Sequence, residues 1–247
     1  NSERLRRYFQ AMMLLGRIDL RIGGENSDAN ARQLASAVVL HDLLRTSKRF
    51  AQWESFDRLL QTFVGRTDSM TFGQLGGLLE AAKITSPAAI ADLATLGRLQ
   101  ADIDQGTLGV QQIRSDYFES SPLGPDRAAL PRSFTTMGQK FVVDSWATAK
   151  LVADDILWHE TKVQRRMPSA LDVAFGVLGN DATIPLLVRR LVDKSGVAFR
   201  DGLPYQHNLA AVRAVIESHP ARAWEDNLYM GWLGTLPEHR PFFAFYM

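Results

Sequence analysis

Apolar residues recur every three or four positions through most of the chain, a spacing that places them on one face of a helix. Leu5, Phe9 and Leu20 follow this spacing near the start, and Phe50 and Trp53 begin a second stripe of the same kind. The pattern predicts an all-α protein whose helices pack as antiparallel hairpins, either in a bundle or in a curved solenoid.

Alternation of apolar and polar residues, which is typical of a strand, is confined to one short stretch. It runs through residues 133–143 and predicts at most one short strand or hairpin there. Three prolines within residues 120–132 mark the main break in the helical pattern. We therefore predict a single helical domain over residues 1–247, with a sub-boundary allowed at 120–132, and interpret the chain as a fragment of a larger protein.

Capping residues predict where several helices begin and end. The first helix is expected to continue to Gly23, and Ser86 is expected to cap one long helix that Gly106 closes. Asp144 is predicted to cap a helix that runs to about Glu160.

Composition excludes several classes of protein. The 28 basic and 27 acidic residues give a net charge of +1, so overall charge indicates neither nucleic acid nor an anionic membrane as partner. The densest basic cluster is short and comprises Arg4, Arg6 and Arg7. The absence of cysteine excludes disulfides and thiolate metal sites, and no apolar run reaches the roughly 20 residues of a membrane-spanning helix.

The stretch ILWHETKVQ resembles the start of a zinc-peptidase motif, in which two histidines lie four positions apart on a helix. Here Val163 stands where the second histidine is needed, and the five histidines of the chain are scattered. We therefore predict no metal and no cofactor. His159 is expected to extend an apolar stripe with Ile156, and the alternative is an acid–base role beside Glu160.

Carboxylates at helix starts have two interpretations. Asp144 is expected to cap its helix and Asp172 to lie in the first turn of the next, where a negative charge is favourable. The alternative is a hydrolase-like enzyme in which acid–base groups come from these two residues, His159 and Glu160.

Tryptophans supply candidate ligand-binding residues. Trp224, Leu228 and Trp232 recur at helical spacing, which favours a buried stripe, although aromatic rings can also support a sugar or a peptide. Basic residues near position 165 are expected to complement a helix C-terminus, with an anion site as the alternative. The candidates are Trp146, Trp158, Arg165 and Trp232.

Four long phrases, in this order along the chain, resemble a bacterial family of domains of unknown function, DUF3160. They are YFQAMMLLGRIDL (8–20), MGQKFVVDSW (137–146), RRMPSALDVAFGVLG (165–179) and WEDNLYMGWLGTL (224–236). Members of that family are larger and often exported or lipid-anchored, and no biochemical activity is assigned to them. The resemblance implies further helical sequence and a β-containing tail beyond residue 247, and a periplasmic or extracellular location.

Two classes of function follow. The first is a binding or scaffold module of an exported protein, which would recognise a peptide or a glycan and contact the remainder of its own longer chain. The alternative is a hydrolase that acts on a glycan or a peptide through the carboxylate and histidine groups named above.

Overall fold

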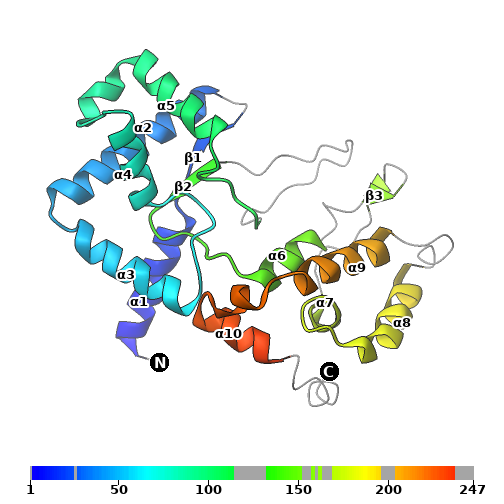
Figure 1. Ribbon diagram of the computed structural model, residues 1–247. Coiled ribbons are helices and arrows are strands. Elements are labelled where there is room, and N and C mark those ends of the chain that lie inside the picture. The colour runs from blue at the N-terminus through cyan, green and yellow to red at the C-terminus, as the bar shows by residue number, and fades with distance from the viewer. Residues whose placement is uncertain are drawn as a thin grey trace. The chain divides into compact units, whose positions relative to one another are not determined.

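The structure is a computed structural model that describes residues 2–24, 27–113, 132–151, 157–158, 161–162, 169–195 and 204–236. The chain separates into two compact units, each with its own apolar core. Unit 1 comprises residues 1–61, 66–114 and 129–140, and unit 2 comprises residues 62–65, 115–128 and 141–247. Most of the described residues are helical, which confirms the predicted all-α class (Figure 1).

Unit 1 packs helices around one short pair of strands. Its elements are α1 (Glu3–Arg17), β1 (Asp19–Gly23), α2 (Ser27–Thr46), α3 (Phe50–Phe63), α4 (Phe72–Ala81), the 3-10 helix η1 (Pro87–Ala91), α5 (Leu93–Gln105) and β2 (Arg132–Thr135). Strands β1 and β2 are antiparallel, with Leu20 opposite Phe134. The Phe134 ring is fully buried and meets Phe72 edge to face at 4.9 Å between ring centres, so the strand pair forms part of the core.

Two predicted helix boundaries in unit 1 are wrong. The first helix ends at Arg17 rather than Gly23, because residues 19–23 pair with β2 and so satisfy their backbone groups in a sheet. Ser86 and Pro87 do begin a helix, but only η1. The carboxylate of Asp92 then accepts hydrogen bonds from the backbone N–H groups of residues 94 and 95 and starts α5 as a separate helix.

Unit 2 is built from short helices. Its elements are α6 (Val143–Lys150), β3 (Leu157–Trp158), β4 (Thr161–Lys162), α7 (Ala170–Gly176), η3 (Asp181–Thr183), α8 (Ile184–Ser195), α9 (Pro204–Glu217), η4 (Ala221–Glu225) and α10 (Leu228–Thr235). Its core joins Leu151 of the α6 end, Leu171 of α7, Val212 and Ile216 of α9, and Leu233 of α10. The helices therefore surround a core of their own, independent of β1 and β2.

The helix predicted to run from Asp144 to about Glu160 is also wrong. Helix α6 starts two residues earlier than expected, with Val142 rather than Asp144 at the cap position, and ends at Lys150. Leu157 then lies opposite Lys162 in the antiparallel pair β3–β4, so the four described residues of the ILWHETKVQ stretch form short strands rather than a helix. Ile156 and His159, on which the predicted apolar stripe depends, lie outside the described residues.

None of the helices that the structure describes combines the length and the apolar character required to cross a membrane. The sub-boundary allowed at residues 120–132 falls, except for Arg132, outside the described part of the chain.

Candidate functional site

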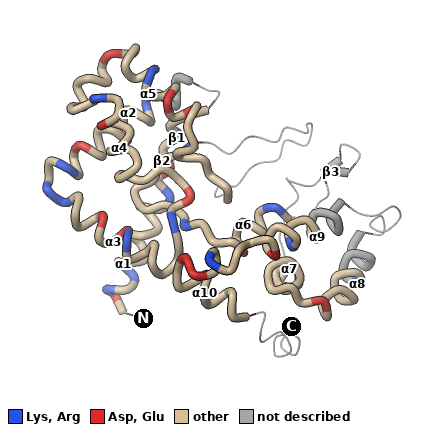
Figure 2. The backbone as a smooth tube through the Cα atoms, in the orientation of Figure 1, with Lys and Arg blue, Asp and Glu red and all other residues tan. Residues whose placement is uncertain are grey.

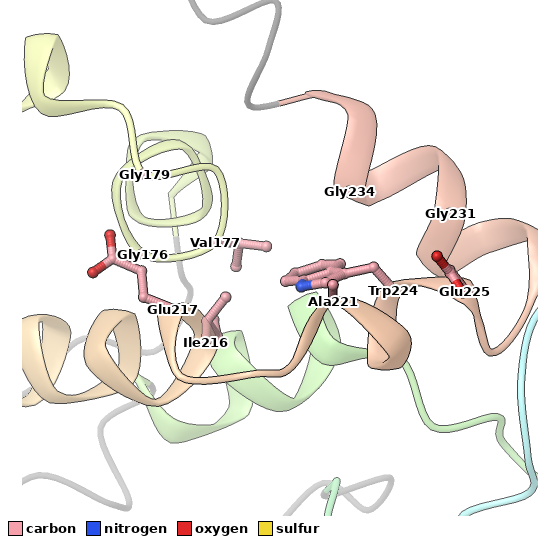
Figure 3. A pocket seen from close by; sticks show the side chains of 10 residues that line it. All are labelled: Gly176, Val177, Gly179, Ile216, Glu217, Ala221, Trp224, Glu225, Gly231 and Gly234. Carbon is pink, nitrogen blue, oxygen red and sulfur yellow. The ribbon is translucent and has the colours of Figure 1, made fainter.

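A hollow of about 410 Å³ opens on the surface of unit 2 beside the indole of Trp224 (Figure 3). We call it the Trp224 hollow. It lies between α7, the end of α9, η4 and α10. Its lining consists of Gly176, Val177, Gly179, Ile216, Glu217, Ala221, Trp224, Glu225, Gly231 and Gly234. A concave, largely apolar surface with a few polar groups at its edge is the usual form of a small ligand site.

Glycines on α10 give the hollow its shape. Asn227 starts α10, because its side-chain oxygen accepts a hydrogen bond from the Met230 N–H at 2.9 Å. Gly231 and Gly234, three positions apart, then face Trp224. A Cβ atom at Gly234 would lie 3.3 Å from the Cβ of Trp224, so the absence of a side chain lets the indole lie against the helix. Figure 3 shows the indole extending from η4 toward Val177.

Acidic groups stand at the edge of the Trp224 hollow. The Glu217 carboxylate accepts a hydrogen bond from Arg213 Nε at 2.7 Å, and Arg213 also pairs with Asp181. The Arg213 guanidinium carbon lies 4.7 Å from the centre of the Phe175 ring, which fixes it further. Glu217 is thus held in place, whereas Glu225 is exposed and forms no ion pair with another described residue. One ordered and one adaptable acceptor therefore flank the indole.

The candidate catalytic carboxylate Asp144 has a structural partner. The Tyr229 hydroxyl donates a hydrogen bond to Asp144 Oδ2 at 2.7 Å and links α6 to α10. Burial, followed by this hydrogen bond and the charge of Asp144, raises the pKa of Tyr229 above its ordinary value. The phenol therefore stays protonated and able to donate.

Asp172 is fully buried in the first turn of α7, as the sequence analysis expects. Its carboxylate accepts a hydrogen bond from the Ser169 N–H at 2.7 Å, so it closes the start of the helix. The two remaining catalytic candidates, His159 and Glu160, lie outside the described residues.

The candidate ligand-binding residues lie in different surroundings. Trp146 is partly buried against the core of unit 2. The Trp232 ring is 54% exposed and lies 5.6 Å from the Tyr229 ring, measured between centres. Trp158 is in β3, where side chains are not described, and Arg165 lies outside the described residues. The predicted buried stripe is wrong for Trp232 and for Leu228, which is 62% exposed.

Sequence reasoning did not select Trp224, Glu217 or Glu225 as site residues. The signal that could have identified the hollow is the pair of glycines three positions apart in MGWLGTL, which leaves one face of the helix bare for an aromatic partner. Within the described residues, no group of three or more metal-binding side chains is placed to hold a metal ion.

A second, smaller hollow of about 260 Å³ belongs to unit 1 and contains His41. The imidazole packs against Phe50 and Phe72, with ring centres 5.7 and 6.4 Å apart. A Cβ atom at Gly76 would lie only 2.8 Å from His41 Nε2, so this glycine makes room for the ring. Asp42 and Arg45, joined by a 2.7 Å ion pair, stand beside it.

We expect unit 1 to lose stability on acidification through His41. Burial, and to a smaller extent the charge of Arg45, lower the pKa of His41 below 6.5, while Asp42 opposes the shift. The stabilising contribution of the neutral ring is complete above 6.5 and is lost as pH falls through the lowered folded-state pKa, because the unfolded chain binds the proton first. The melting temperature of wild type should therefore fall more than that of His41→Gln between about pH 7.5 and about pH 5.5. An equal fall in the melting temperature of the two proteins would contradict the assignment of this pH dependence to His41.

Among the described residues, the fold and the Trp224 hollow define a mostly helical protein with a small aromatic surface site. The chain belongs to the family described as "Protein of unknown function (DUF3160)", which matches residues 1–242. The resemblance drawn from the four phrases is thereby confirmed over nearly the whole chain. No curated protein and no solved structure matches it.

Proposed function

We propose that this DUF3160 chain is a binding module and that the Trp224 hollow takes part of a glycan. The observation that carries the proposal is the indole of Trp224, which lies partly exposed beside bare glycine backbone in a hollow edged by Glu217 and Glu225. A pyranose ring has an apolar face that packs on an indole and hydroxyl groups that donate to carboxylates.

Binding accounts for the described residues better than hydrolysis. Asp144 holds Tyr229, and Asp172 is buried at the start of α7, so both acids already have structural roles. Glu217 and Glu225, in contrast, stand at the edge of an open surface. The hydrolase alternative stays a prediction, as does an exported location.

The Trp224→Ala variant is expected to weaken glycan binding at least about tenfold, because the aromatic contact at the centre of a small site contributes most of its affinity. Binding is measured by isothermal titration calorimetry with soluble neutral oligosaccharides. Trp232→Ala is the matched control, since that tryptophan is 54% exposed and on the adjacent helix but does not line the hollow.

A second variant keeps the test informative if the Trp224→Ala protein does not fold. Gly231→Leu keeps the indole and places a side chain in the hollow, so it should weaken binding to a similar degree. Binding of a lysine-rich peptide but of no oligosaccharide would point to cation–π recognition and overturn the glycan proposal. Equal loss in Trp232→Ala would overturn the assignment to this hollow.

A further inference from the structure

Helix α1 leaves an amphipathic face without a partner in the described part of unit 1. Although eight of its fifteen residues are apolar or aromatic, none of its residues is buried. The Leu5 and Phe9 side chains are 66% and 63% exposed, and Tyr8 is exposed as well. Helix α5, of similar length, buries three leucine or isoleucine side chains. Exposed aromatic and aliphatic residues gathered on one face indicate an interaction surface.

Three exposed residues and the half-buried Met12 form one stripe. Leu5, Tyr8, Phe9 and Met12 are three or four positions apart and so share a face, whereas Leu14 lies half a turn away on the opposite face. The helix is attached at its other end, where the Thr136 hydroxyl donates to the carbonyl oxygen of Leu15 at 2.9 Å. The stripe therefore lies on the N-terminal part of α1, beyond this attachment.

Basic residues flank the stripe on both sides. At 100° per residue, Arg4 and Arg6 lie on either side of Leu5. The four arginines of α1 against one glutamate give it a formal charge of +3, whereas the whole chain carries +1 (Figure 2). Glu3 pairs with Arg6 and Arg7 at 3.2 and 3.0 Å, but these pairs are exposed and weak enough to exchange for a phosphate.

We propose that α1 binds the surface of an anionic membrane, with Leu5, Tyr8 and Phe9 inserted at the boundary between headgroups and acyl chains. The flanking arginines contact lipid phosphates, and the helix lies in the plane of the membrane without crossing it. The net charge of the whole chain is close to zero and so does not reveal the excess of positive charge on α1.

The charge of α1 favours lipid over a second copy of the chain. Two α1 helices in contact would bring together two charges of +3 with one glutamate each, which is unfavourable at moderate ionic strength. Anionic headgroups offer the opposite charge on both sides of the stripe, as the placement of Arg4 and Arg6 requires. A tyrosine at the margin of the stripe also suits the interface, since its ring is apolar and its hydroxyl stays hydrated.

The test is flotation of the full 247-residue chain with vesicles of phosphatidylcholine alone or mixed with phosphatidylglycerol. We expect binding to the anionic vesicles only, and release at high salt. Phe9→Asp should reduce the bound fraction at least about tenfold, because it removes a large inserted side chain and adds a repelled charge. Circular dichroism is expected to show an unchanged fold, since Phe9 is exposed.

Leu14→Asp is the matched control, with the same substitution at a residue that is 62% exposed on the opposite face of the same helix. It should bind anionic vesicles like wild type. The proposal is overturned if wild type fails to float, if both variants lose binding equally, or if binding is the same for both lipid compositions. A vesicle-independent dimer that Phe9→Asp abolishes would assign the face to a second copy and also overturn it.

Discussion

Replacing Lys140 by methionine is expected to destabilise unit 1 by about 3–5 kcal/mol, because it leaves a buried carboxylate without its counter-charge. Lys140 Nζ lies 2.7 Å from Asp57 Oδ1 and 2.7 Å from Thr67 Oγ1, while Asp57 Oδ2 accepts a hydrogen bond from Gln61. The Lys140 and Asp57 side chains are 10% and 8% exposed. Little water can therefore reach the orphaned charge.

The measurement is the free energy of unfolding in urea, with hydrogen exchange used to follow the amides of unit 1 separately. Arg58→Met is a suitable control, because Arg58 lies next to Asp57 on α3 and pairs with Glu54 at the surface, at 3.7 Å. It should change stability by less than about 1 kcal/mol.

A double variant separates the cost of an orphaned charge from the value of the ion pair. Asp57→Leu combined with Lys140→Met removes both charges and should recover most of the stability lost by Lys140→Met alone. If Lys140→Met costs no more than Arg58→Met, the ion pair is solvated and its buried placement is incorrect.

Short-range signals in the sequence predicted the helical parts of this fold well. Gly106 was expected to close a helix, and it is the C-cap residue of α5. Asp172 was expected in a first turn and is found there. Such features depend on residues a few positions away in the sequence, so a short stretch of sequence is enough to predict them.

Pairings between distant residues could not be predicted in this way. Leu20 fits the apolar spacing of the first helix, yet it pairs with Phe134 in β1–β2 because that partner, more than a hundred positions away, offers both a sheet edge and a buried site. Asp57 and Lys140 are likewise separated by 83 positions. The residues next to Leu20 or Asp57 in the sequence do not indicate which distant residue each of them will contact.

The candidate site could likewise be predicted from the sequence only in part. Aromatic residues near 224–236 were considered as a ligand platform from the sequence, and this stays a prediction, but choosing among them required the surroundings of each ring. Trp232 and Trp224 both fit one helical stripe in the sequence, whereas the break between η4 and α10 turns only Trp224 toward the glycines. Helical spacing alone does not reveal that break.

The Gly138→Ala substitution is expected to destabilise unit 1 by about 3 kcal/mol, at the upper end of what overpacking usually costs. A Cβ atom there would overlap Thr135 Oγ1 and would lie 2.7 Å from Ser69 Oγ and 2.9 Å from Thr67 Cγ2. The Ser69 and Thr135 hydroxyls share a buried 2.6 Å hydrogen bond, which the methyl group would force apart. The loss is measured by urea unfolding, as for Lys140.

Gly77→Ala makes the same chemical change where nothing lies within 4 Å of the new Cβ. It should stabilise α4 by up to about 1 kcal/mol, because alanine favours a helix more than glycine does. Opposite signs for the two substitutions would show that close packing, and not backbone freedom, requires the glycine at position 138. Adding Thr135→Ala to Gly138→Ala removes the overlapping hydroxyl and should restore part of the stability. If Gly138→Ala left the free energy of unfolding unchanged, the packing of residues 135–138 against residues 67–69 would be contradicted.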